Sequence, residues 1–177
     1  MPYTIAKPRM NEKWPATARH LFEVIQKAYG DPDEVTTNFV VWYHNEPWKR
    51  TTLHREGILH NFPVPHEDVL EQTVDYRVPK EKVEELARFD GSILIDRTAG
   101  ELSARCQNEQ MNMVLLNLAH QIVVNEMTPE TARETFAGMM SGFKFNWSTP
   151  LAKKLYLPLG RLVDRENDTC DPDSQMH

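Results

Sequence analysis

The residues best suited to chemistry gather in one short stretch of the sequence. Four of the seven histidines lie there, at His44, His54, His60 and His66, and Glu67 and Asp68 follow directly. Imidazole nitrogen and carboxylate oxygen are ligands that Zn²⁺ and Fe²⁺ take in proteins. No pair has a diagnostic spacing such as HExxH. We therefore expect these histidines to hydrogen-bond to backbone groups or water and not to bind a metal. The alternative is a metal site, for which His54, His60 and His66 are the candidate ligands.

Aromatic side chains share this region, and two interpretations of them stay open. Trp42, Tyr43, Trp48, Phe62 and Tyr76 could belong to the core of a sheet, since aromatic residues are favoured in strands. They could also line a concave pocket for a flat apolar ligand. The candidates for such a pocket are Trp42, His44, His60, Tyr76, Asn117 and His120.

Asn117 and His120 interrupt a helix, expected over residues 109–126, that is apolar nearly all round. They are three residues apart and share a face of that helix. A buried polar side chain needs a partner, because leaving it unpaired costs about 1–3 kcal/mol. The partner is a backbone carbonyl, a neighbouring side chain or a ligand.

Signatures of catalysis are missing from the sequence. It contains no glycine-rich phosphate loop, no GxSxG and no nucleophile–base pattern. Cys106 follows Leu102 and Ala104 on the side of an expected strand that faces inward, where a thiol behaves as a small hydrophobic group. We predict no catalytic residue and no cofactor, and a protein that is more readily a binding protein than an enzyme.

A segment near the C-terminus is basic and aromatic although the chain is acidic. Phe143, Phe145 and Trp147 precede Lys153 and Lys154. This composition fits a surface that docks on a partner protein or on an anionic membrane. The alternative is a C-terminal wrap that packs its aromatic side chains on the core.

Length and charge limit the class of protein. The 177 residues suit one domain, expected over 1–163, with an extended arm at 1–13 and a disordered acidic tail at 164–177. The net charge of −6 argues against a nucleic-acid binder. Two cysteines without CxxC spacing favour a reducing cytoplasm. The longest apolar run is too short for a membrane span, so we expect no integral membrane contact.

Hydrophobic periodicity predicts the order of the elements. We expect helices at 15–29, 79–89, 109–126, from 129 onward and at 150–157, and strands at 38–44, 49–55, 58–62, 70–78, 92–97 and 101–106. Strands joined by tight turns indicate an antiparallel sheet. The predicted fold is a single-domain α+β fold, in which about five to six strands pack against a central apolar helix and flanking helices.

Two resemblances accompany this order. The run Leu102-Ser103-Ala104-Arg105-Cys106, followed by Leu116-Asn117-Leu118-Ala119-His120, resembles uncharacterised cyanobacterial proteins and implies no activity. The order helix, three strands, helix, two strands, helix is similar to the fold of type III secretion chaperones, which are small, acidic and dimeric. That resemblance rests on element order alone and leaves out the helices after Thr128.

The leading functional expectation is a non-catalytic cytoplasmic accessory protein. It would act through protein–protein interaction, as a chaperone or adaptor, and form a homodimer, because one small domain has more sheet and aromatic surface than it can cover alone. The alternative is a small-molecule-binding protein or enzyme with an aromatic and histidine-lined pocket, with or without a metal ion.

Overall fold

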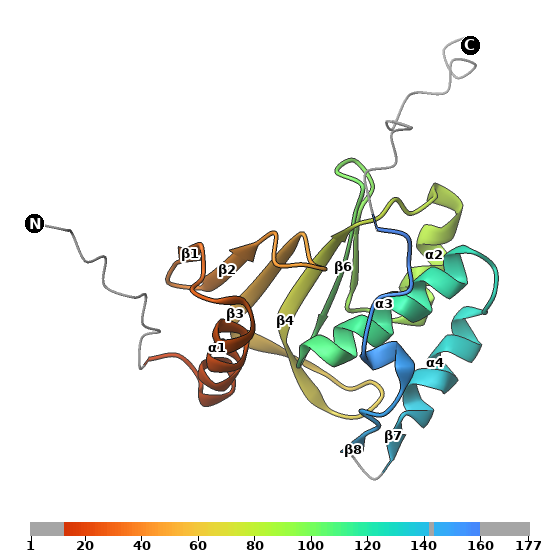
Figure 1. The fold of residues 1–177 in the computed structure, drawn as a ribbon. Coiled ribbons are helices and arrows are strands. Elements are labelled where there is room, and N and C mark those ends of the chain that lie inside the picture. Colours follow the sequence, from red (N-terminus) through yellow and green to blue (C-terminus); the bar gives the residue numbers. More distant parts are fainter. Residues whose placement is uncertain (1–12, 142–143, 160–177) are drawn as a thin grey trace, which may run out of the picture.

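A six-stranded antiparallel sheet with helices on one face forms the fold (Figure 1). The computed structural model describes residues 13–141 and 144–159. The strands are β1 (Glu34–Val35), β2 (Phe39–Tyr43), β3 (Arg50–His60), β4 (His66–Asp75), β5 (Ile93–Asp96) and β6 (Glu101–Cys106), in the order β1-β2-β3-β4-β6-β5. The helices are α1 (Ala16–Tyr29), α2 (Val83–Phe89), α3 (Glu109–Val123) and α4 (Pro129–Gly138). The predicted α+β class is confirmed.

The helix α3 lies at the centre of the larger core, as predicted. Its side chains are buried nearly all round, because α3 packs on β6 and β4 on one flank and on α2 and α4 on another (Figure 1). Asn108 caps its first turn by accepting a hydrogen bond from the Met111 N–H at 3.0 Å. Asn125 follows the helix with φ of +62°, a left-handed conformation that asparagine tolerates.

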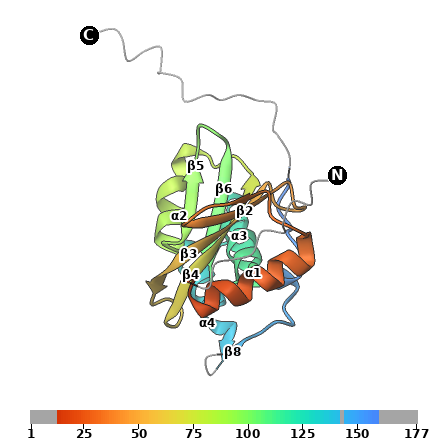
Figure 2. The same ribbon diagram turned by 90° about the vertical axis from the view of Figure 1, so that its left-hand side faces the viewer.

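The helix α1 covers the other half of the same sheet face. Val40, Leu53 and Leu70 are cross-strand neighbours on β2, β3 and β4, and they pack with Phe22 and Ile25 of α1 in a second core cluster. Figure 2 shows α1 running across the strands. The opposite sheet face carries polar pairs, such as Thr73 with Ser103 at 2.8 Å.

A polar cluster joins the two cores. Glu109, in the first turn of α3, accepts hydrogen bonds at Oε2 from Tyr29 Oη (2.9 Å), Gln72 Nε2 (2.9 Å) and Trp48 Nε1 (3.3 Å). Burial and the Glu109 carboxylate raise the pKa of Tyr29, which therefore stays a donor. One carboxylate thus links α1, the sheet and α3.

Several boundaries differ from the sequence-based prediction. β4 begins at His66, whereas the alternation of apolar residues predicted a start at residue 70; inward-facing His66 and Asp68 are polar and hide the strand from a hydrophobic pattern. The expected strands 49–55 and 58–62 are one strand with an irregularity. The expected helix 150–157 is only a 3₁₀ turn, Pro150–Ala152.

Short elements were also not foreseen. They are β1, the two-stranded sheet of β7 (Met140–Ser141) and β8 (Lys144–Phe145), and the 3₁₀ turn Lys80–Lys82 that opens the helix expected at 79–89. The expected arm lies outside the described residues except for Lys13, and so does the expected tail. Among the residues that are described, no helix is long and apolar enough to cross a membrane.

Replacing the shared acceptor should destabilise the protein. Glu109→Leu leaves the donors of Tyr29, Trp48 and Gln72 without their acceptor, so we expect the free energy of unfolding to fall by about 2–4 kcal/mol in urea titrations. Glu130→Leu is the matched control, because Glu130 lies in the first turn of α4 with an exposed side chain. Equal losses in both variants would show that Glu109 acts only through the helix dipole.

Candidate metal centre

The placement of the histidines depends on an irregularity in β3. Leu53 pairs with Leu70 of β4, but Ile58 pairs with Asp68, so the β3 residues between Leu53 and Ile58 lie opposite the single residue Val69. The number of extra residues is odd, which reverses the alternation of faces along β3. Before the irregularity, the odd-numbered residues of β3 face the helices. After it, the even-numbered residues do.

This reversal separates the three candidate histidines. His54 is the first residue of the irregular segment and lies on the polar sheet face, where its Nε2 is 3.1 Å from Oε2 of Glu71. That interaction lowers the pKa of Glu71. His60 lies after the irregularity and pairs directly with His66, the first residue of β4. Thus His60 and His66 come together, and His54 does not join them.

Asp68 completes a group of three potential ligands. It lies two residues after His66 on β4 and therefore on the same face. One ligand atom from each of His60, His66 and Asp68 lies within 4.8 Å of the others. Within residues 13–141 and 144–159, this is the one group of three or more histidine, cysteine or acidic side chains that is so close.

The atoms of this group approach one another without forming aligned hydrogen bonds. Asp68 Oδ2 lies 3.1 Å from His60 Nδ1, and Asp68 Oδ1 lies 2.9 Å from His66 Nε2. Yet His60 Nδ1 and Asp68 Oδ1 are buried and have no hydrogen-bond partner. Ligands of a tetrahedral zinc ion lie about 3.3 Å apart when their bonds are about 2 Å long. The two short separations involve different oxygens of Asp68, and one ligand atom from each residue lies within 4.8 Å of the others, so the three side chains would have to close in slightly to share one cation.

The second nitrogen of His66 has a fixed role. Nδ1 lies 2.7 Å from the carbonyl oxygen of Val64 and donates to it, because a carbonyl only accepts. Nε2 therefore faces Asp68 as the available ligand atom, an arrangement typical of metal-bound histidine. Burial lowers the pKa of His66, but the Asp68 carboxylate and the Val64 carbonyl outweigh burial and raise it above its ordinary value.

Two further groups surround the cluster. Cys106, at the end of β6, places Sγ 3.3 Å from His66 Nε2, and burial raises the pKa of its thiol. Asp90, at the end of α2, lies with Oδ1 3.9 Å from His60 Nε2. Its Oδ1 accepts from the N–H and Oγ of Ser92, while its buried Oδ2 has no partner. Asp90 adds negative charge just outside the group.

Access to the cluster is from the side of His60. The side chain of His60 is 21% exposed, whereas those of His66 and Asp68 are 3% and 7% exposed. An ion can thus reach the group past His60 and then lose most of its water. In such a dry position, charge interactions with Asp68 are stronger than at the surface.

The six residues predicted to line a pocket lie in several places. Tyr76 and His120 meet, with Tyr76 Oη 2.8 Å from His120 Nδ1. Burial raises the pKa of Tyr76 to about 12 and lowers that of His120, so a neutral hydroxyl donates to a neutral ring. Trp42 instead packs against Phe22 of α1 and donates to the Gly30 carbonyl. His60 belongs to the cluster above.

Asn117 finds its partners in the backbone. Its Nδ2 donates to the carbonyls of Leu151 and Lys154 at 2.9 and 2.8 Å, and its Oδ1 accepts from the Tyr156 N–H at 2.7 Å. The buried amide therefore holds the C-terminal segment 151–156 on α3. Of the three partners considered from the sequence, backbone groups are the ones that the structure provides.

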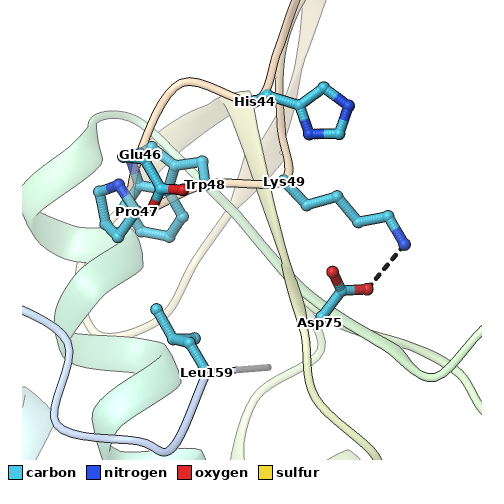
Figure 3. Close-up of a pocket in the computed structure, with 7 residues that line it drawn as sticks. All are labelled: His44, Glu46, Pro47, Trp48, Lys49, Asp75 and Leu159. Carbon is cyan, nitrogen blue, oxygen red and sulfur yellow. Dashed lines mark hydrogen bonds and ion pairs between the residues drawn. The ribbon is translucent and has the colours of Figure 1, made fainter. Parts of the chain in front are cut away.

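His44 borders a shallow hollow of about 270 Å³ (Figure 3). The other lining residues are Glu46, Pro47, Trp48, Lys49, Asp75 and Leu159. Lys49 lies 2.7 Å from Asp75, and His44 points away from Trp48. The hollow is small for an organic ligand, and its one cation, Lys49, is already paired with Asp75 and Glu101. We assign no ligand to it.

The predicted docking residues are only partly described. Phe143 lies outside the described residues, and the side chain of Phe145 in β8 is not described. Trp147 is half-exposed, and Lys153 and Lys154 are exposed, with Lys154 Nζ 4.7 Å from the centre of the Tyr156 ring. Their role in docking on a partner stays a prediction.

Sequence reasoning noted Asp68 beside the histidines without naming it as a candidate ligand, and it missed Cys106 and Asp90 as members of the cluster. A signal existed for Asp68, since a His-x-Asp pattern within a strand places both side chains on one face. No local signal predicts Cys106 or Asp90, because they come from β6 and from the end of α2.

Comparisons with protein-family models, with curated proteins and with solved structures found no significant match. The two resemblances therefore stay predictions.

The hairpin of β3 and β4 requires glycine at position 57. A Cβ atom on Gly57 would lie 2.9 Å from Cβ of Glu67, so the strands would have to move apart. We expect Gly57→Ala to lower the free energy of unfolding by about 1–3 kcal/mol in urea titrations. Gly91→Ala is the control, because nothing lies within 4 Å of its added Cβ. Similar losses in both variants would contradict the close approach.

The contacts of Asn117 predict a local effect. Asn117→Leu removes three hydrogen bonds to segment 151–156, so we expect a stability loss of about 2–3 kcal/mol and faster tryptic cleavage at Lys153 and Lys154. Gln121→Leu, a partly exposed position of the same helix, is the control and should leave cleavage unchanged. Unchanged cleavage in Asn117→Leu would show that the amide does not hold the segment.

Proposed function

We propose that this protein binds a divalent transition-metal ion of the zinc class through His60, His66 and Asp68. The observation that carries the proposal is the convergence of two imidazoles and one carboxylate, with ligand atoms within 4.8 Å and without aligned hydrogen bonds between them. Buried polar atoms without partners cost about 1–3 kcal/mol each. A cation would provide the missing partner for all of them at once.

The charges of the cluster support a divalent cation. Asp68 supplies one negative charge in direct contact, and Asp90 supplies a second one beyond His60. The guanidinium of Arg105 opposes them, but it is directed to the backbone carbonyls of Asp68 and Glu56. The two imidazoles bind as neutral ligands, and His66 is already oriented by the Val64 carbonyl.

The bound ion would have a structural effect. His60 ends β3 and His66 begins β4, so an ion between them would hold the two strands together at the base of the turn that joins them, residues 61–65. Binding energy at a site that the unfolded chain lacks becomes folding energy. We therefore expect the metal to stabilise the hairpin.

Binding of a partner protein is the second candidate function, and one observation favours it. Ile58 and Leu59, next to His60, are 58% and 66% exposed. Because successive side chains of a strand point to opposite faces, each face of this end of the hairpin carries one exposed apolar side chain that a partner could contact. A metal that orders the end of the hairpin would also order these two residues. We retain the non-catalytic, homodimeric accessory protein as a proposal on this basis.

The proposal is tested by metal titration of protein purified without a histidine tag. We expect calorimetry to show about one Zn²⁺ bound per chain and a thermal midpoint that rises with free Zn²⁺. Asp68→Asn and His66→Gln should each weaken binding about 100-fold or more, because each removes a ligand or its charge. His54→Gln is the matched control, since His54 lies in the same hairpin on the opposite sheet face.

Two results would contradict the proposal. One is the absence of stoichiometric binding to the wild-type protein. The other is a loss of affinity in His54→Gln that equals the loss in His66→Gln, since this would place binding on the outer face or on the histidines in general.

A further inference from the structure

We infer that Cys106 supplies the fourth ligand of the proposed metal site and closes it as a non-catalytic centre. This inference rests on the proposed function, and it specifies the fourth ligand and the role of the ion. The ligand set would be two imidazole nitrogens, one carboxylate oxygen and one thiolate sulfur, drawn from β3, β4 and β6.

The position of the thiol supports this set. Cys106 pairs with Leu70 of β4, so it lies on the helix-covered face that also carries His66 and Asp68. Its Sγ contacts His66 Nε2 at 3.3 Å, a separation similar to that expected between two ligands of one tetrahedral ion. The three-residue group does not include Cys106, so its sulfur must move toward His60 when an ion binds.

The fourth ligand position lies on the side of the cluster that solvent does not reach. His60 is the ligand on the exposed side, whereas Cys106 is fully buried on the inner side, with Met111 Sδ 4.0 Å from its Sγ. Catalytic zinc sites keep one position for water, and structural zinc sites fill all four with protein ligands. A fourth position that points at a buried thiol belongs to the second kind.

Ligation by Cys106 also determines which class of metal ion the site favours. The thiol loses its proton to solvent as the metal–sulfur bond forms, so the bound sulfur is a thiolate. Thiolate favours zinc-class metals over Mg²⁺, Ca²⁺ and Mn²⁺, which prefer oxygen ligands. The ion would then join the end of β6 to the β3–β4 hairpin.

Cobalt substitution tests the inference, because Co²⁺ replaces Zn²⁺ and reports its ligands by absorption. The test uses full-length protein in which Cys170, the other cysteine of the sequence, is changed to serine. We expect visible bands of four-coordinate Co²⁺ and a near-ultraviolet thiolate-to-cobalt band. Cys106→Ser should abolish the near-ultraviolet band, keep the visible absorption and weaken binding about 10-fold or more.

The outcomes separate the two proposals. Co²⁺ binding without a thiolate band, or with a band that persists in Cys106→Ser, overturns the role of Cys106 and leaves the three-residue site standing. No Co²⁺ binding to the parent protein overturns the proposed function and this inference with it. The circular dichroism spectrum of Cys106→Ser must match that of the parent protein. If that variant does not fold, a thiolate band in the parent supports ligation by Cys106, because Cys106 is its remaining cysteine, and the absence of the band overturns it.

Discussion

The register shift within β3 is the constraint on which the candidate site depends. The backbone irregularity between Leu53 and Ile58 reverses the faces of the strand, so Leu53 contributes to the core near α1 while His60, further along, faces His66. With regular pairing throughout, His60 would lie on the polar face with His54. The close approach at Gly57 belongs to this same irregular segment. Backbone geometry thus decides which histidines meet.

The interior holds two kinds of polar group, and the contrast between them supports the metal site. Glu109 and Asn117 are held by several aligned hydrogen bonds, and both connect separate parts of the fold. His60 and Asp68 are equally close to polar neighbours but retain buried atoms without partners. Interiors satisfy most of their polar atoms. The unpartnered atoms of His60 and Asp68 face one another, and this is the observation on which the proposed metal site rests.

Much of the fold was predictable because hydrophobic periodicity determines it. The amphipathic pattern of α1, the all-apolar α3 and the Thr128-Pro129 start of α4 are local signals, and all three helices are found. The start of β4 was not predictable in this way, because its inward residues His66 and Asp68 are polar. The pattern that reveals strands is thus weakest where a strand carries a polar site.

The candidate site was predictable only in part. Residue type singled out His60 and His66, but His54 has the same type and lies on the other face. Separating them requires the register of β3, which no local pattern specifies. Cys106 and Asp90 join the cluster through tertiary contacts between segments distant in sequence. Local sequence therefore supplies the candidate ligands, and the pairing of strands selects among them.

Anomalous diffraction from crystals grown with Zn²⁺ tests the central claim most directly. We predict one strong peak at the zinc edge, within bonding distance of His60 Nδ1, His66 Nε2 and Asp68, at about 2 Å. A peak beside His54 and Glu71, or no peak in crystals whose protein is otherwise intact, would contradict it.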